Sequence, residues 1–494
     1  MRFLSYSKIG FVALALFILI LPVSISIRFM QNDDWNRYVS VARFLTGNFE
    51  LLSVTATTFY TQGVLGMIFA SVFPLNLLPV VTLFVAVSCF YVTTLISYKF
   101  YKQTKINSAL LGLLIFLNPI FIYSVWGFMT EIYLLFFILM SIYFANKSSN
   151  IKLSVSWILG FLAKQSAIVI PVGVVIAQVV SKKYRPAMIN LLILIMVLAF
   201  YFFIFPMTSE MTGQKSIKFE NLNSIKHVYS NIFASLIYIS IFLLPITLTA
   251  TLYKLKNVLV LVATLLVSYA LYLLFINTNF PWKIFPYYPN VFTSMGFFYQ
   301  GLTGAPTGYN YSSIFNLISS FSLFIMVIFA FLNMNLKSIK NFTISFEFYS
   351  LLFGIFLIIV NPFVFDRYIL ILIPIAMFLL LKLSDYKINS KILIIFIVLE
   401  GFISLDFSSE FISRQNIIWE LGNTTSESFG IEKKLIRADH AWNSLYNVNL
   451  SDYRYEIRFD DENCASCKNP IMGPFQSGKF LTKSKIVLIK NEKL

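Results

Sequence analysis

Charged residues are scarce in this sequence, and so are the residues that usually bind metals. Only 12% of its 494 residues are charged, 58% are hydrophobic, and the mean hydropathy is +0.77. A soluble chain is about 25% charged, and a disordered one needs low hydrophobicity and high net charge. Both classes are therefore excluded. With three cysteines, two histidines and no HExxH motif, a zinc protease or zinc ribbon has no basis either. The composition is that of a multi-span membrane protein.

Acidic residues are the scarcer charged type, 22 against 38 basic residues, which gives a net charge of +16. In a soluble domain this balance would suggest a nucleic-acid partner. Here the basic residues lie between apolar segments, as in the cytoplasmic loops of membrane proteins. No basic stripe with interleaved aromatic residues is present. We therefore expect membrane lipid, and no nucleic acid, among the partners.

Apolar stretches close to the roughly 20 residues that a helix needs to cross a bilayer predict an all-α polytopic membrane protein with about thirteen transmembrane helices. The predicted spans are 9–29, 75–98, 107–123, 131–146, 152–163, 166–180, 187–206, 231–253, 257–276, 313–333, 342–360, 368–383 and 391–405. With Arg2 and Lys8 in the cytoplasm, this count puts every basic cluster on the cytoplasmic side, as the positive-inside rule requires. The alternative for the first span is a cleaved signal peptide, because Ser24 and Ser26 are small residues at a plausible cleavage distance.

The same count divides the chain into a transmembrane module, 1–405, and an extracytoplasmic extension, 406–494, which has ordinary charge density. The localisation expected is a multi-pass integral protein of a bacterial-type plasma membrane. The first outer loop, 30–74, carries Tyr38, Ala42 and Leu45 at helical spacing, which predicts an amphipathic helix on the membrane surface. The CxxC at 464–467 lies in the extension and predicts either a local outer disulfide or no role at all, since no thioredoxin-like strand and helix surround it.

Three acidic residues on the outer side are candidates for chemistry. Asp33 and Asp34 directly follow the first span, and Glu131 opens the fourth. Adjacent acids can also be a solvated loop or a helix N-cap, and an acid at a span end can be solvated at the interface. Placed together, they could supply a general base and a positioning group, or hold a divalent cation. That cation is the one cofactor the sequence suggests.

Two cations on the same side could bind a phosphate. Lys164 lies at an outer turn between two short apolar stretches, where its alternative is snorkelling to the interface. Arg367 is outside by the same count, against the positive-inside trend, and its alternative is an ion pair with Asp366. An arginine can clamp a phosphate with two parallel hydrogen bonds. Acids and cations together suit transfer of a group from a phosphate-bearing donor.

These residues resemble a known family, the polytopic GT-C glycosyltransferases, in particular members related to protein O-mannosyltransferases and lipid A aminoarabinose transferases. The likeness is scattered over most of the chain. It rests on Asn32-Asp33-Asp34-Trp35 with Tyr38, Arg43 and Gly47; Gln62 and Gly66; Phe128-Met129-Thr130-Glu131; Lys164-Gln165; Tyr288-Pro289-Asn290 with Gly296; Asp366-Arg367-Tyr368 with Pro374; and Ser413-Arg414-Gln415, Trp419, Gly430-Ile431 and Ala441-Trp442 in the extension.

The resemblance implies a helical bundle with surface helices in the first loop and a small outer C-terminal domain. It also implies inverting transfer of a sugar from a polyprenyl-phosphate donor to a glycan, lipid or protein acceptor on the extracytoplasmic face. The catalytic acid of the family leads a D-E-x-x-Y motif. Aligning Tyr38 with that tyrosine makes Asp34 the equivalent, which we favour, whereas aligning the acidic pair makes it Asp33. The residues expected to bind substrate are Lys164, Gln165, Arg367, Tyr368, Tyr38, Gln62, Tyr288 and Asn290.

Two other functions remain open at this point. A transporter or flippase of lipid-linked glycans would favour broken helices, charges near the bilayer midplane and paired halves. Here the acids lie at one surface and no internal repeat is visible. A glycan polymerase or ligase would use a diphosphate-linked glycan and more often has several arginines in its outer loops. The outer loop 277–312 contains one basic residue, Lys283.

Overall fold

The computed structural model describes most of the transmembrane module and most of the C-terminal region. The described residues are 2–27, 33–52, 58–205, 219–254, 312–333, 342–361, 366–383, 388–460, 470–478 and 484–491, with Cys467 and a few residues between 262 and 297. Tyr288 and Asn290 lie outside them. Each predicted span is helical, except 257–276, of which only a few residues are described.

Apolar helices build most of the molecule. Among the described residues, four helices are long and apolar enough to cross a membrane: Lys8–Ser26 of α1 (Arg2–Ser26), Leu75–Phe100 including α4 (Leu78–Phe100), Tyr184–Phe203 including α10 (Tyr184–Ala199), and α19 (Ser390–Phe429). The number rises to six if each of two bent helix pairs counts as one span. The chain is therefore that of an integral membrane protein. The count of thirteen spans is not confirmed, because several predicted spans are short helices: α7 (Thr130–Asn146), α8 (Asn150–Phe161), α9 (Val169–Val180), α17 (Phe346–Val360) and α18 (Leu372–Leu383).

The bent pairs break where the sequence stops one helix and starts the next. α5 (Lys105–Phe116) and α6 (Pro119–Val125) meet at 66°. Asn118 caps α6, since its side chain accepts a hydrogen bond from the backbone N–H of Ile120 at 3.0 Å. Pro119 follows at the first helical position, where its missing N–H costs nothing. The second pair is α12 (Ile225–Phe242) and α13 (Leu244–Lys254), at 69°; α15 (Ser312–Asn333) packs against both.

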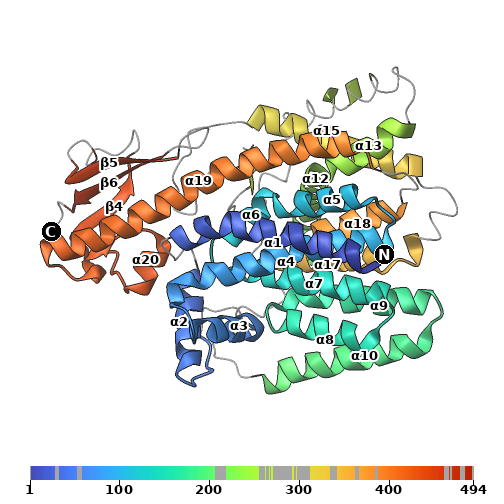
Figure 1. Ribbon diagram of the computed structural model, residues 1–494, viewed down its shortest axis with the longest axis horizontal. Helices are drawn as coiled ribbons and strands as arrows, with labels where there is room; N and C mark the ends of the chain where they lie inside the picture. Colours follow the sequence, from blue (N-terminus) through green and yellow to red (C-terminus); the bar gives the residue numbers. More distant parts are fainter. Residues whose placement is uncertain are drawn as a thin grey trace.

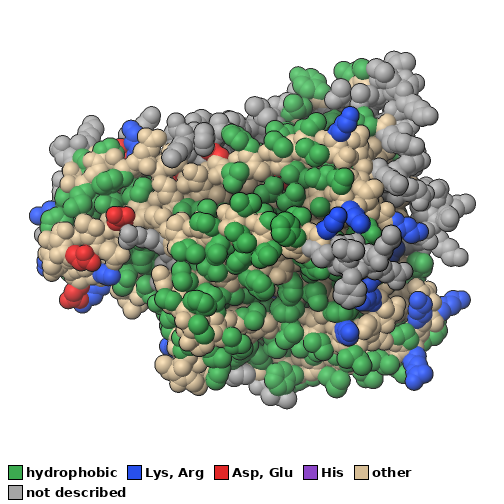
Figure 2. Space-filling view, in the orientation of Figure 1, with side chains coloured by type: hydrophobic (Ala, Val, Ile, Leu, Met, Phe, Trp, Pro, Cys, Tyr) green, Lys and Arg blue, Asp and Glu red, His purple; other side chains and the backbone are tan. Residues whose placement is uncertain are grey.

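The two ends of the bundle differ in charge. The loops after α4, α7 and α9 all return to the end where the N-terminus lies (Figure 1). Lys and Arg side chains gather at that end, with hydrophobic side chains along the middle (Figure 2). We call it the basic end, defined by Lys99, Lys102, Lys105, Lys147, Lys182 and Lys183. This arrangement agrees with the charge pattern from which the sidedness was predicted.

Two helices form in the loop 30–74, as predicted, and pack against each other at the opposite end. They are α2 (Asp34–Leu45) and α3 (Tyr60–Ala70). The buried face of α2 includes Asp34, Arg37, Val41 and Phe44, which follow helical spacing. Gly66 of α3 allows the close approach, because a Cβ there would lie 3.0 Å from the side chain of Val41 on α2 and 2.8 Å from the ring of Phe128. The face of α2 that packs inward thus carries the acidic motif.

The C-terminal region is not helical throughout. α19 runs for 40 residues, crosses residue 405 without a break, and ends where Gly430 adopts a left-handed conformation. A four-stranded sheet follows, in the order β3-β4-β6-β5, with β3 (Ile436–Arg437) parallel to β4 (Tyr455–Phe459) and the other pairs antiparallel. β5 (Met472–Ser477) and β6 (Ser484–Lys490) pack against α19 (Figure 1). The all-α prediction is wrong here, because the buried run Ile486–Ile489 suits a covered strand.

Candidate active site

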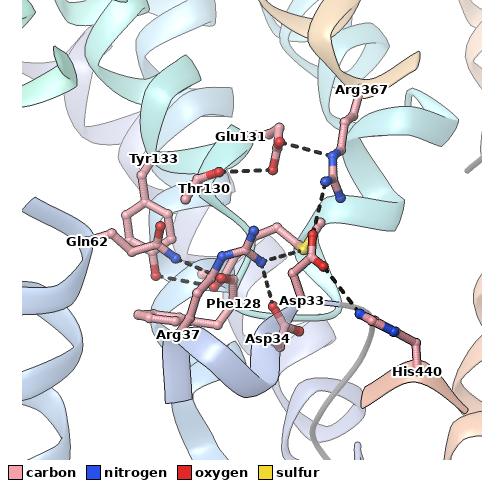
Figure 3. A network of polar contacts seen from close by, with 12 residues as sticks. Asp33, Asp34, Arg37, Gln62, Phe128, Thr130, Glu131, Tyr133, Arg367 and His440 are labelled. Carbon is pink, nitrogen blue, oxygen red and sulfur yellow. Dashed lines mark hydrogen bonds and ion pairs between the residues drawn. The ribbon is translucent and has the colours of Figure 1, made fainter. Parts of the chain in front are cut away.

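Six charged side chains from four separate segments meet at the end opposite the basic end (Figure 3 shows most of them). We call them the ion cluster. Asp33, Asp34 and Arg37 lie at the start of α2, and Glu131 lies in the first turn of α7. Lys164 lies between α8 and η2 (Gln165–Ile168), and Arg367 lies in η6 (Asp366–Ile371). The structure thus brings together every acid and cation that the sequence singled out, although their segments are far apart in the chain.

Glu131 is the centre of the cluster. Its Oε1 lies 2.8 Å from Lys164 Nζ and 3.2 Å from Arg367 Nε. The Thr130 hydroxyl donates to its Oε2 at 3.4 Å. The carboxylate is buried, and a buried charge is stable only when it is paired. Glu131 is therefore the counter-ion that holds two cations in place.

Lys164 is turned into the cluster, and its side chain is largely buried. Besides Glu131, its ammonium contacts the face of Tyr368, 4.0 Å from the ring centroid. Such a cation–π contact favours a fixed position of the charge. These two contacts favour a place in the cluster over the snorkelling alternative for Lys164. Tyr368 is brought to the site as expected, as a support for this cation.

The two adjacent aspartates have different surroundings. Asp34 is fully buried, and its Oδ1 accepts a hydrogen bond from Arg37 Nη1 at 3.0 Å. The Asp33 side chain is 35% exposed; its Oδ2 lies 3.4 Å from Arg367 Nη2 and its Oδ1 lies 3.8 Å from His440 Nε2. Asp33 occupies the N-cap position of α2 but makes no side-chain cap hydrogen bond. Neither acid is a plain solvated loop residue.

Three of the expected substrate-binding residues support the framework around the ion cluster. Gln62 Nε2 donates to the carbonyl oxygen of Phe128 at 2.8 Å and so ties α3 to the turn before α7. Gln165 Nε2 donates to the Tyr201 hydroxyl at 3.0 Å and ties η2 to η3 (Phe200–Ile204). Tyr38 is half-buried on α2 and packs against the hydrophobic core.

Two residues of the site were missed from the sequence. Arg37 holds Asp34, and its Nη1 also lies 2.9 Å from Met129 Sδ. Its spacing of three residues from Asp34 on a helix was a usable signal, since side chains at that spacing are neighbours. His440 belongs to α20 (His440–Leu445), and only the packing of α20 against α2 brings it near Asp33. No local pattern marks it.

The C-terminal region holds α20 firmly. Asp439 caps it, with Oδ1 accepting from the backbone N–H of Trp442 at 2.8 Å. Burial raises the pKa of Asp439 to about 6, against the hydrogen bond from Trp442 and the nearby His440 and Arg414, which lower it. The buried Trp442 packs against Gly422 of α19, where a larger residue would collide with its ring. The position of His440 therefore follows from the packing of α20 on α19.

Among the described residues, no group of three or more histidine, cysteine, aspartate or glutamate side chains is placed to hold a metal ion. A divalent cation remains an expectation of the sequence alone. In the part of the chain that the structure describes, Cys89 is a free, buried cysteine and Cys467 is disulfide-bonded.

Comparison with known proteins gives little at the level of sequence. The chain matches no protein-family model and no curated protein. Two solved structures are similar to it, both of ArnT from Cupriavidus metallidurans, one bound to undecaprenyl phosphate and one in the apo state. The match to the bound structure covers 98% of this chain and 97% of the ArnT chain, with 11% sequence identity and a TM-score of 0.37. The match to the apo structure covers 98% of each chain, with 10% sequence identity and a TM-score of 0.36.

A structural similarity this low does not indicate what the chain does, whereas the chain's own residues do.

Proposed function

We propose that the chain is a membrane glycosyltransferase that moves a sugar from a polyprenyl-phosphate donor to an acceptor on the extracytoplasmic face. The observation that carries this proposal is the ion cluster at the end opposite the basic end. Arg37, Lys164 and Arg367 form a group of cations suited to a phosphate, and carboxylates beside them can accept a proton. The motifs shared with GT-C enzymes supply the donor class.

The roles follow from the contacts of each side chain. Both Asp33 oxygens face a partner, Arg367 on one and His440 on the other, at 3.4 and 3.8 Å. We assign proton transfer to Asp34, beside Arg37 at the head of α2, because aligning Tyr38 with the tyrosine of the family's motif makes Asp34 the equivalent of the catalytic acid. Glu131 orients Lys164 and Arg367, which bind the departing phosphate. A buried, preorganised set of cations stabilises charge that develops as the bond breaks.

The proposed reaction is a single displacement. Asp34 takes the proton of an acceptor hydroxyl as that oxygen bonds to the anomeric carbon of the sugar. The bond between this carbon and the phosphate oxygen breaks, and its electron pair leaves with the polyprenyl phosphate. Attack from the face opposite the phosphate inverts the anomeric configuration. Lys164 and Arg367 neutralise the negative charge that the phosphate gains.

A flippase of lipid-linked glycans is the second candidate, because the 66° break between α5 and α6 is a feature that transporters share. The charges argue against it. Glu131 is in the first turn of α7, Lys164 follows α8, and Arg367 precedes α18. The cluster therefore lies at helix ends, whereas transporter sites lie near the middle of broken helices.

The test is sugar transfer in purified membranes with a radiolabelled polyprenyl-phosphate sugar pool and the endogenous acceptor. Asp34→Asn should lower the rate by about 10² to 10⁴-fold, the usual contribution of a general base. Asp33→Asn should retain more activity, and Glu432→Gln is the matched control, because Glu432 is exposed and pairs with Lys434 away from the cluster. Loss only in Asp33→Asn would move the base by one residue. Full transfer in both variants would overturn the proposed mechanism.

A further inference from the structure

The C-terminal region reaches the ion cluster through His440. This residue opens α20, and its side chain is 57% exposed, with Nε2 facing the Asp33 carboxylate (Figure 3). Asp33 in turn faces Arg367 with its other oxygen. A chain of three charged or titratable groups therefore leads from the C-terminal region to one of the two cations that Glu131 holds.

The charges of the ion cluster are balanced. Asp33, Asp34 and Glu131 face Arg37, Lys164 and Arg367, so these six described residues are neutral as a set. An anionic phosphate binds better to a site with net positive charge. The imidazole of a histidine changes its charge between about pH 5 and 8. A protonated His440 attracts the Asp33 carboxylate and so weakens the ion pair between Asp33 and Arg367. The positive charge of Arg367 is then less neutralised and attracts a bound anion more strongly.

We propose that His440 is a positioning residue that acts through Asp33, so that protonation of the C-terminal region strengthens phosphate binding at the ion cluster. The proposal rests on the proposed function, because the anion is the phosphate of the polyprenyl donor. Through His440, the C-terminal region would contribute to phosphate binding at the ion cluster.

Other groups around His440 also titrate or carry charge. Asp439 precedes it and has a pKa raised to about 6 by burial, with Arg414 of α19 acting on Asp439. Asp33 faces it from the start of α2, and Arg367 of η6 lies behind Asp33. A phosphate monoester titrates near pH 6 as well. The contribution of His440 must therefore be measured against a variant that keeps all of these groups.

The experiment measures binding of a radiolabelled polyprenyl monophosphate without sugar to the purified full-length protein in detergent, between pH 5.5 and 8.5. Wild type is compared with His440→Gln, which keeps a hydrogen-bonding side chain of similar reach and cannot be protonated. Wild type should bind up to about fivefold more tightly at pH 5.5, the range of an exposed ion pair, and equally at pH 8.5. His227→Gln is the matched control and should follow wild type, because His227 lies on α12 and contacts the carbonyl oxygen of Ile359.

A ratio of affinities that stays constant with pH would overturn the proposal, since it would indicate a structural role. The Asp33→Asn background gives the second criterion. If His440 acts through Asp33, His440→Gln should have no further effect there, and a persistent effect would contradict the assignment. Binding without any His440 effect would leave the proposed function standing and overturn this inference alone. A wild type that binds no polyprenyl phosphate at any pH would overturn both.

Discussion

Buried glutamates at the two ends of the bundle have different partners. Glu131, at the site end, has two cations within 3.2 Å and a weak hydroxyl contact. Glu347 of α17, at the basic end, accepts hydrogen bonds from the hydroxyls of Tyr101, at 2.5 Å, and Ser345 and has one cation, Lys382, at 3.1 Å. The Lys382 side chain is 36% exposed, whereas that of Arg367 is 4% exposed. Burial of an acid is common to both ends, but buried cations beside it distinguish the proposed site.

The different partners of the two glutamates indicate a structural role for Glu347 and a place in the candidate site for Glu131. The groups around Glu347 tie α17 to α18 and to the end of α4 with neutral donors and one solvated cation. Around Glu131, cations are withdrawn from water, which is costly unless a counter-charge is present. This is the arrangement to which we assign the proposed phosphate site. Asp439 gives a third case, in which a buried carboxylate accepts a backbone hydrogen bond and its pKa is raised.

Glu131→Gln should have the largest effect. It leaves Lys164 and Arg367 without their shared counter-ion, and removing one partner of a buried ion pair costs about 3 to 5 kcal/mol. Sugar transfer should be lost, and the detergent-solubilised protein should unfold at a lower temperature. Both are checked by a transfer assay and a thermal unfolding scan on the same preparation. A variant with wild-type stability and wild-type transfer would remove the contrast with Glu347.

The second prediction concerns pH and Asp439. Its pKa is about 6 in the folded protein against an ordinary value of 3.8, so the neutral acid is the form that favours folding. The stability it contributes is present below pH 3.8 and is lost as the pH rises through 6, up to about 3 kcal/mol.

Limited proteolysis of the C-terminal region should therefore be faster at pH 7.5 than at pH 5. Asp439→Asn should reduce this difference because asparagine does not titrate. A wild type with equal cleavage rates at both pH values would contradict the raised pKa.

Glu347→Gln should have a smaller effect, about 1 to 2 kcal/mol of stability, because glutamine can keep part of the hydrogen bonds and Lys382 is solvated. Sugar transfer should stay near the wild-type rate once protein levels are matched. The measurement is the same pair of assays as for Glu131→Gln. A loss of transfer as large as that of Glu131→Gln would show that the two acids are equivalent.

Arg367→Lys should have a similarly small effect and sharpens the comparison within the site. Lysine keeps the charge but loses the planar fork that reaches Glu131 and Asp33 together. We expect the KM for the polyprenyl-phosphate donor to rise about tenfold, equal to about 1.4 kcal/mol, with a smaller change in kcat. An unchanged KM would argue against a phosphate role for Arg367.

Much of the helical structure could be predicted from the sequence, because hydropathy and helical spacing are local properties. The helices in 30–74 and the common side of Asp34, Glu131 and Arg367 follow from such patterns. The break at Asn118-Pro119 was missed, because the predicted span 107–123 runs through it. The sheet was missed, because strand pairing joins distant residues: Ile457 of β4 lies opposite Leu488 of β6. A short strand has little signal of its own until its partner is known.

By itself, the sequence determined the class of protein, the apolar helices and the charged residues that could do chemistry, because each is set by residue type and local spacing. Only the tertiary structure decided which charges meet. It paired Glu131 with Lys164 and Arg367, placed Asp34 beside Arg37, and brought His440 to Asp33. Ion pairs between distant segments form only where packing places those segments side by side, and no local pattern in the chain records that packing.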